Sequence, residues 1–130
     1  MPKFLLFFVA LLWTGIVSYF CLVNSNEIPT INIPNLDKFI HTFFHFVFTF
    51  VWFLFFRKQF RRDNTVKPLM YSFVFSFVFG IAIEILQQQI TSTRHADILD
   101  IVANTTGATL AVFTVLICIK FNILNSVLKK

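Results

Sequence analysis

Four long apolar runs, separated by short polar connections, occupy most of this chain. They extend from Phe4 to Val23, from Phe39 to Phe56, from Leu69 to Leu86 and from Ile98 to Ile119. Each is close to the roughly 20 residues that a helix needs to cross about 30 Å of hydrocarbon. We therefore expect an all-α, four-transmembrane-helix bundle, with helices at about 4–23, 38–57, 68–88 and 97–119. The connections leave no room for a soluble domain, so residues 1–130 are expected to form a single membrane domain.

The composition indicates that lipid is the solvent of the fold. Of the 130 residues, 57% are hydrophobic and 13% are charged, which is too little polar surface to cover a soluble globule of this size. The first run is longer than the roughly 7 to 15 apolar residues of a signal-peptide core, and it ends in Ser18-Tyr19-Phe20-Cys21 rather than in small residues. We therefore expect it to be retained as the first helix, with the lipid bilayer as the main partner.

Basic residues are concentrated on one side of the predicted topology. They precede the first run, follow the last and crowd the connection between the second and third: Lys3, Arg57, Lys58, Arg61, Arg62, Lys67, Lys120, Lys129 and Lys130. The positive-inside rule assigns these segments, and with them both termini, to the cytoplasm. The formal net charge of +5 thus reflects topology and contact with anionic lipid. It does not indicate a nucleic-acid partner.

Nine polar residues gather on the opposite side of the predicted membrane. Three separate segments deliver them: Asp37, Lys38, His41, Glu84, Gln87, Arg94, Asp97, Asp100 and Asn104. Within each segment the spacing is helical, at three, four or seven residues, so that each set forms one stripe. A carboxylate that faces hydrocarbon costs about 2.5 to 3.5 kcal/mol, so these stripes are expected to face the bundle interior or a wet cavity.

Some of these residues have a simpler explanation than function. Asp37 and Asp97 stand at predicted helix starts, where an acid often does no more than cap the helix and favour its dipole. Asp100 and Glu84 lie further into apolar sequence, so capping does not explain them and a functional role is favoured. Glu84 is also near a helix C-terminus, the unfavourable end of the dipole, which makes it a candidate for proton exchange. His41 is expected to be a hydrogen-bond partner rather than a metal ligand, and His45 to be incidental.

Small residues recur every four positions in the last run. Ala103, Gly107 and Ala111 form the small-xxx-small pattern that lets helix backbones approach closely. Asn104 lies beside them and can hydrogen-bond across such a contact. This face is therefore interpreted as a helix-packing face, with Asn104 at the border between packing and site.

The polar pattern carries a family resemblance over residues 37–111. The motifs Asp37-Lys38-x-x-His41, Glu84-x-x-Gln87 and Arg94-x-x-Asp97-x-x-Asp100-x-x-x-Asn104-x-x-Gly107-Ala108 resemble the VanZ-like family of small bacterial integral membrane proteins. The resemblance implies a multi-pass protein of the bacterial cytoplasmic (inner) membrane, with a cell-envelope role linked to tolerance of teicoplanin-type glycopeptide antibiotics. Three positions depart from the family pattern, in which an aromatic residue, Phe and Gly are usual: His45, Gln89 and Ala111.

Three kinds of function fit the polar residues. The first is a binding protein whose outward-facing site recognises an anionic cell-wall precursor, a lipid head group or the glycopeptide. The second is a membrane-embedded hydrolase or transferase acting on such a substrate. The third is a structural protein in which ion pairs such as Asp100 with His41 only lock the helices.

Candidate roles follow from residue chemistry. The candidate catalytic residues are Asp100, Glu84 and His41, because carboxylates and imidazole divide general acid and base roles. The candidate ligand-binding residues are Arg94, Asp37, Lys38, Gln87, Asp97 and Asn104, with the two cations suited to a phosphate or carboxylate. The carboxylates with His41 would also suit a divalent metal. The sequence contains no HExxH or other paired metal motif, so it assigns no metal ligand and no cofactor.

Overall fold

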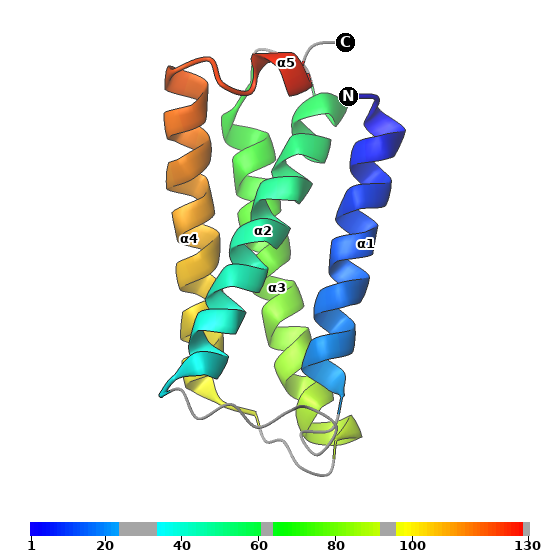
Figure 1. Ribbon diagram of the computed structural model, residues 1–130, viewed down its shortest axis with the longest axis vertical. Helices are drawn as coiled ribbons and strands as arrows, with labels where there is room; N and C mark the ends of the chain where they lie inside the picture. Colours follow the sequence, from blue (N-terminus) through cyan, green and yellow to red (C-terminus); the bar gives the residue numbers. More distant parts are fainter. Residues whose placement is uncertain (24–33, 61–63, 92–95, 129–130) are drawn as a thin grey trace.

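Four long antiparallel helices make up the bundle in this computed structural model, which describes residues 1–23, 34–60, 64–91 and 96–128. The helices are α1 (Lys3–Leu22), α2 (Leu36–Gln59), α3 (Val66–Ile90) and α4 (Ile98–Lys120), and a single turn, α5 (Asn125–Leu128), follows them (Figure 1). All four long helices have the length and apolar composition to cross a membrane. The described residues contain no strand, and each observed bound differs by one or two residues from the expected one. The predicted all-α four-helix fold is confirmed.

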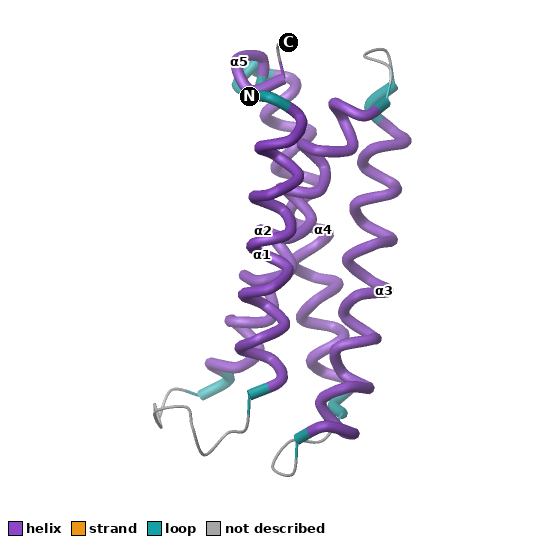
Figure 2. Tube along the Cα trace, turned by 90° about the vertical axis from the view of Figure 1, so that its right-hand side faces the viewer, coloured by secondary structure: helices purple, strands orange, loops and turns teal. Residues whose placement is uncertain are grey.

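Consecutive helices run in opposite directions, so both chain ends lie at the same end of the bundle (Figures 1 and 2). The Met1 ammonium donates a hydrogen bond to the Val127 carbonyl at 3.2 Å, and the Lys58 ammonium donates one to the Met1 carbonyl. The starts of α2 and α4 and the end of α3 lie together at the other end. Both α2 and α3 contact the other three long helices, and the most extensive contact in the bundle is between α2 and α4.

The ends of α4 show how local sequence sets helix bounds. At its start, the Asp97 carboxylate accepts a hydrogen bond from the Leu99 backbone N–H at 2.9 Å, which satisfies one of the unpaired amides of the first turn. At its end, Asn122 adopts a left-handed backbone with φ of 58°, a conformation that Asn tolerates better than most residues. The Ile123 N–H then donates back to the Cys118 carbonyl at 2.9 Å and closes the helix.

Aromatic side chains fill the middle of the bundle. Phe48 stacks on Phe79 with ring centroids 4.7 Å apart, and Trp52 meets Phe75 edge-on at 4.9 Å. The Trp52 indole N–H donates to the Thr14 hydroxyl at 3.1 Å, which satisfies a polar group that the apolar core would otherwise leave unpaired. These contacts join α1, α2 and α3 around one core.

The distribution of polarity is opposite to that of a soluble protein. Large apolar side chains are widely exposed on the outside, among them Phe4 (74% exposed) and Ile98 (78%). Inside, the bundle buries ten polar or charged side chains among the described residues, including Glu84 and Asn104. An outer surface of this kind matches lipid as solvent, and the interior then supplies the partners that polar groups need.

Gly107 is a place where the backbones of α2 and α4 are in close contact. A Cβ at this position would overlap the Thr42 carbonyl oxygen and lie 2.9 Å from the Thr42 carbonyl carbon and 3.0 Å from the Phe46 nitrogen. All three obstacles are backbone atoms, which cannot rotate away. Ala103 and Ala111, one turn to either side, are buried at the same face. The small-xxx-small stripe is therefore a contact face, as its spacing predicted.

Gly107→Ala should destabilise the bundle, because the added methyl forces α2 and α4 apart. We expect the free energy of unfolding to fall by about 1–3 kcal/mol or more, the usual range for an overpacked contact. Thermal or denaturant unfolding of the purified protein in detergent measures this change. Gly15→Ala is the matched control, since a Cβ at Gly15 meets nothing within 4 Å. Equal stability of the two variants would contradict the assignment of Gly107 to a close backbone contact.

Candidate functional site

Seven of the nine predicted site residues meet at the end of the bundle opposite the termini. They come from the first turns of α2, the last turns of α3 and the start of α4, and we call them the polar cluster: Asp37, Lys38, His41, Glu84, Asp97, Asp100 and Asn104. Arg94 lies outside the described residues. Gln87 is described but lies elsewhere, as shown below.

Lys38 is the hub of the polar cluster. Its ammonium donates to Asp37 at 3.0 Å, to Asp97 at 2.7 Å and to Asp100 at 2.5 Å, so each of its three protons has a carboxylate acceptor. Asp37 is on the same helix, whereas the other two acids belong to the start of α4. The ammonium therefore ties α2 to α4 by charge-assisted hydrogen bonds.

Asp97 links all three helices of the site. Its carboxylate accepts from Lys38 of α2 and caps α4, and its backbone N–H donates to the Glu84 carboxylate of α3 at 3.1 Å. The hydrogen bond from the Lys38 ammonium, and then that from the Leu99 N–H, hold the pKa of Asp97 below its usual range. The capping role expected for Asp97 is present, and it coexists with a place in the charged network.

His41 lies between the charged part of the cluster and the helix-packing face. Its Nδ1 hydrogen-bonds with the Asn104 side-chain oxygen at 3.0 Å, and its Nε2 is 3.6 Å from the Asp100 carboxylate. Since the Asn104 oxygen only accepts, the proton of a neutral ring is on Nδ1, and Nε2 then presents a lone pair. Asn104 thus orients the imidazole in addition to packing.

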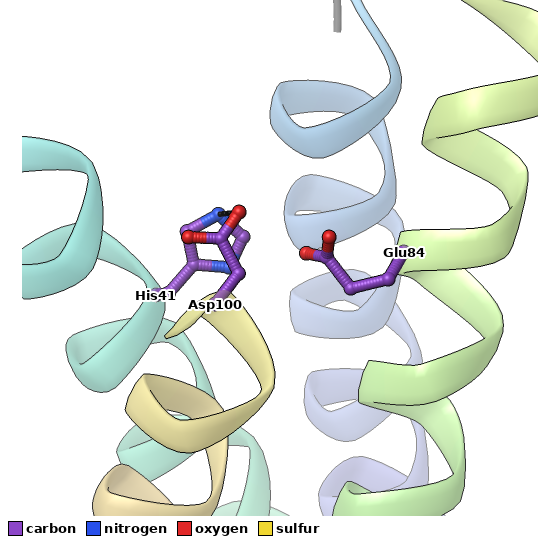
Figure 3. A group of neighbouring side chains, drawn as sticks. All are labelled: His41, Glu84 and Asp100. Carbon is purple, nitrogen blue, oxygen red and sulfur yellow. Dashed lines mark ion pairs between the residues drawn. The ribbon is translucent and has the colours of Figure 1, made fainter. Parts of the chain in front are cut away.

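Glu84 is the most deeply buried acid of the cluster. It is 1% exposed, and one carboxylate oxygen, Oε2, accepts from the Asp97 N–H. The other, Oε1, is buried without a hydrogen-bond partner. In Figure 3 the Glu84 carboxylate points from α3 toward the His41 ring and the Asp100 carboxylate. A buried carboxylate oxygen without a donor is costly, so this atom identifies a place where a positive charge or a proton would be stabilised.

Gln87, in contrast, is separate from the polar cluster. Its side-chain amide donates to the Cys21 backbone carbonyl at 2.6 Å. It is buried and satisfies a carbonyl in the last turn of α1. The structure therefore places Gln87 at the junction of α3 with α1.

A second layer of buried polar groups continues one turn deeper than the cluster. His45 Nδ1 hydrogen-bonds with the Ser76 hydroxyl at 2.8 Å, and His45 is 1% exposed. Gly80 makes this layer possible, since a Cβ there would lie 2.9 Å from the Asn104 amide nitrogen and 3.1 Å from His45 Cε1. The sequence interpretation treated His45 as incidental. The missed signal was the four-residue spacing of Ser72, Ser76, Gly80 and Glu84 along α3.

The outer surface has shallow hollows, and they are distinct from the site. One lies on the apolar face of α1, lined by residues such as Leu12 and Gly15, and another lies between α3 and α4 beside Phe77 and Leu110. Neither includes a residue of the polar cluster. Their apolar linings suit contact with lipid chains.

The chemistry of the cluster is that of a cation or proton site. Among the described residues, the carboxylates of Asp37, Asp97 and Asp100 share the Lys38 ammonium, and a fourth carboxylate, that of Glu84, accepts instead from the Asp97 backbone N–H. His41 adds an imidazole nitrogen, Nε2, that lies 3.6 Å from the Asp100 carboxylate. The residues able to hold a metal ion together are His41, Glu84 and Asp100, with one donor atom from each within 4.8 Å of the others.

Lys38→Met should destabilise the protein by about 1–3 kcal/mol, because it leaves carboxylates near the bundle interior without their donor. Lys38 helps to hold the pKa of Asp97 below its usual range, so the loss should be full above that range and shrink as the pH falls through it, since protonation removes the uncompensated charge. Unfolding in detergent across a pH series measures this effect. Lys67→Met, which removes an exposed ammonium at the opposite end, is the control. A pH-independent loss would contradict the charge argument.

Comparison with known proteins agrees with this architecture. No curated protein and no solved structure matches the chain. The VanZ/LLP1 family model matches residues 4–120, which span α1 to α4 and all nine predicted site residues. With nearly the whole chain covered, α1 included, this multi-pass membrane protein belongs to the VanZ/LLP1 family.

Proposed function

We propose that this protein lies in the bacterial cytoplasmic membrane with its polar cluster facing outward. There it binds the head group of an anionic envelope lipid or cell-wall precursor and contributes to tolerance of glycopeptide antibiotics. The main support for this proposal is that three helices bring Lys38, four carboxylates and His41 to one end of a bundle whose outer surface is apolar.

The distribution of basic residues supports this orientation. Lys3, Arg57, Lys58, Lys67 and Lys120 all lie at the end of the bundle that carries the termini (Figure 1). The positive-inside rule assigns that end to the cytoplasm. The polar cluster then faces the extracytoplasmic side, with both termini inside.

The exposure of the cluster supports binding at the membrane surface. Its side chains are progressively less exposed toward the interior, from Asp37 (63%) and Asp97 (43%) to Lys38 (23%) and Asp100 (10%). A head group at the lipid–water boundary would therefore meet an open charged rim above a buried floor. The protons of Lys38 already have carboxylate acceptors, so the positive charge that such a ligand requires would come from Arg94, which the sequence assigns to the same outer side.

Two other functions have specific support. The His41 Nε2 atom lies 3.6 Å from Asp100, an arrangement suited to general acid–base chemistry, which favours a hydrolase or transferase acting on the same kind of substrate. The ion pairs of Lys38 with Asp97 and Asp100 join α2 to α4, which favours a purely structural role. The experiment below separates these readings.

Asp100→Asn and Glu84→Gln should each abolish most of the glycopeptide tolerance that the wild-type protein confers on a susceptible bacterium. Both changes keep side-chain shape but remove the charge that the site requires. The measurement is the minimal inhibitory concentration of teicoplanin, normalised to the amount of protein in the membrane. Lys67→Gln, at the opposite end, is the control and should protect like the wild type.

The outcomes discriminate among the three functions. Loss of protection at normal abundance supports a binding or catalytic site. If the wild type also forms a product and Asp100→Asn does not, the protein is an enzyme. A loss of membrane abundance supports the structural role. Full protection by both variants at normal abundance would refute the proposed site.

The orientation has an independent test by cysteine labelling of intact cells. In a background where Cys21 and Cys118 are replaced by Ala, a cysteine at Gln89 should react with an impermeant maleimide. One at Asn64 should react only after permeabilisation, because the two positions lie at opposite ends of the bundle. The reverse pattern would place the polar cluster in the cytoplasm and overturn the proposal.

A further inference from the structure

We propose that His41, Glu84 and Asp100 form a binding site for one divalent first-row metal ion of the Zn²⁺ or Mn²⁺ type. The three residues come from three different helices, and one donor atom of each lies within 4.8 Å of the others (Figure 3). Each is buried, with exposures of 6%, 1% and 7%. No two of them are close in the sequence, so folding alone creates this donor set.

Each of the three side chains is held through one atom and offers another. His41 is held at Nδ1 by Asn104, Glu84 at Oε2 by the Asp97 N–H, and Asp100 at Oδ1 by Lys38. The second atoms are His41 Nε2, Glu84 Oε1 and Asp100 Oδ2. Hydrogen bonds that orient metal ligands through their far atoms are a regular feature of metal centres, because they fix the tautomer and direction of the ligand.

The unpartnered Glu84 Oε1 is a separate observation that calls for a ligand. The atom is fully buried in a side chain that is 1% exposed, and no donor from the residues that the structure describes reaches it. His41 Nε2 and Asp100 Oδ2, 3.6 Å apart, are likewise two acceptors when the ring proton is on Nδ1. A bound cation would stabilise buried acceptor atoms of this kind, for which the described residues show no donor.

The charge of the surroundings points the same way. Lys38 is shared by Asp37, Asp97 and Asp100, and the one donor that the described part of the chain gives Glu84 is a neutral N–H. Among the described residues, four carboxylates therefore face one ammonium. A divalent ion would offset the negative charge of the two most buried carboxylates, Glu84 and Asp100.

The donor types and spacing select the class of metal. Donor atoms that each lie about 2.1 Å from an ion are roughly 3 to 4.2 Å from one another. Here His41 Nε2 and Asp100 Oδ2 are 3.6 Å apart, and the three donor atoms lie within 4.8 Å of one another. Small side-chain adjustments would therefore be enough to bind an ion. One imidazole with two carboxylates favours Zn²⁺ or Mn²⁺ over Mg²⁺, which prefers oxygen ligands and retains its water.

Three protein ligands also leave coordination positions for an exogenous oxygen. An ion at this place would supply positive charge to a phosphate or carboxylate of an anionic head group. This last step rests on the proposed function. The metal site itself does not, because its readout is metal content and affinity rather than antibiotic tolerance.

The test is metal titration of the full-length protein in detergent after treatment with a chelator. Isothermal titration with Zn²⁺ and with Mn²⁺, checked by elemental analysis, should give one ion per chain, and a tenfold excess of Mg²⁺ should not displace it. His41→Gln, Glu84→Gln and Asp100→Asn should each lose this stoichiometric site. Asn104→Ala, which frees the imidazole, should weaken affinity about 10- to 100-fold.

His45→Gln is the matched control, since His45 is a second buried histidine one turn deeper on the same helix and is hydrogen-bonded to Ser76. It should bind metal like the wild type. Absence of stoichiometric binding to the wild type would overturn the proposal. So would normal binding by all three ligand variants, or equal loss in His45→Gln.

A spectroscopic measurement on the wild type keeps the proposal testable if a variant does not fold. Pulsed electron paramagnetic resonance of the Mn²⁺-loaded protein should show coupling to one imidazole ¹⁴N nucleus, because His41 is the one nitrogen ligand. Bound Mn²⁺ without nitrogen coupling would place the ion on carboxylates alone and overturn the assignment.

Discussion

The pairing of Lys38 with carboxylates from two helices is the interaction on which the charged end of the bundle depends. An ammonium or carboxylate that faced lipid alone would be strongly unfavourable, whereas three acids around one ammonium satisfy every proton of that group. Because Asp97 also donates its N–H to Glu84, the same network reaches α3. The network therefore positions each of its members.

Close helix packing is what allows these ionic contacts to form. Gly107 brings the α4 backbone against that of Thr42 in α2, and Gly80 leaves room for Asn104 and His45 beside α3. With a larger residue at either place, α4 would lie further from its neighbours, and Asp100 and Asn104 would move away from His41. The smallest residues of the chain thus support its most polar region.

Much of the site was predictable because polar side chains in lipid-facing helices have few alternatives. The helical stripes and the alternating topology were enough to bring Asp37, Lys38, His41, Glu84, Asp97, Asp100 and Asn104 to one end. Gln87 shares the stripe of Glu84 yet turns to the Cys21 carbonyl, and periodicity does not reveal which neighbouring helix a side chain meets. Nor does periodicity reveal that His45, which was interpreted as incidental, is buried and hydrogen-bonded with Ser76.

The sequence by itself determined that the chain forms four membrane helices and which residues share each polar stripe, because hydropathy and helical period act within a single segment. Only the tertiary structure decided which stripes meet. It placed Lys38 against Asp97 and Asp100, left Glu84 Oε1 without a donor, and brought one donor atom each of His41, Glu84 and Asp100 within 4.8 Å of the others. These contacts join different helices, so they depend on interhelical distance and rotation, which the spacing within one helix does not specify.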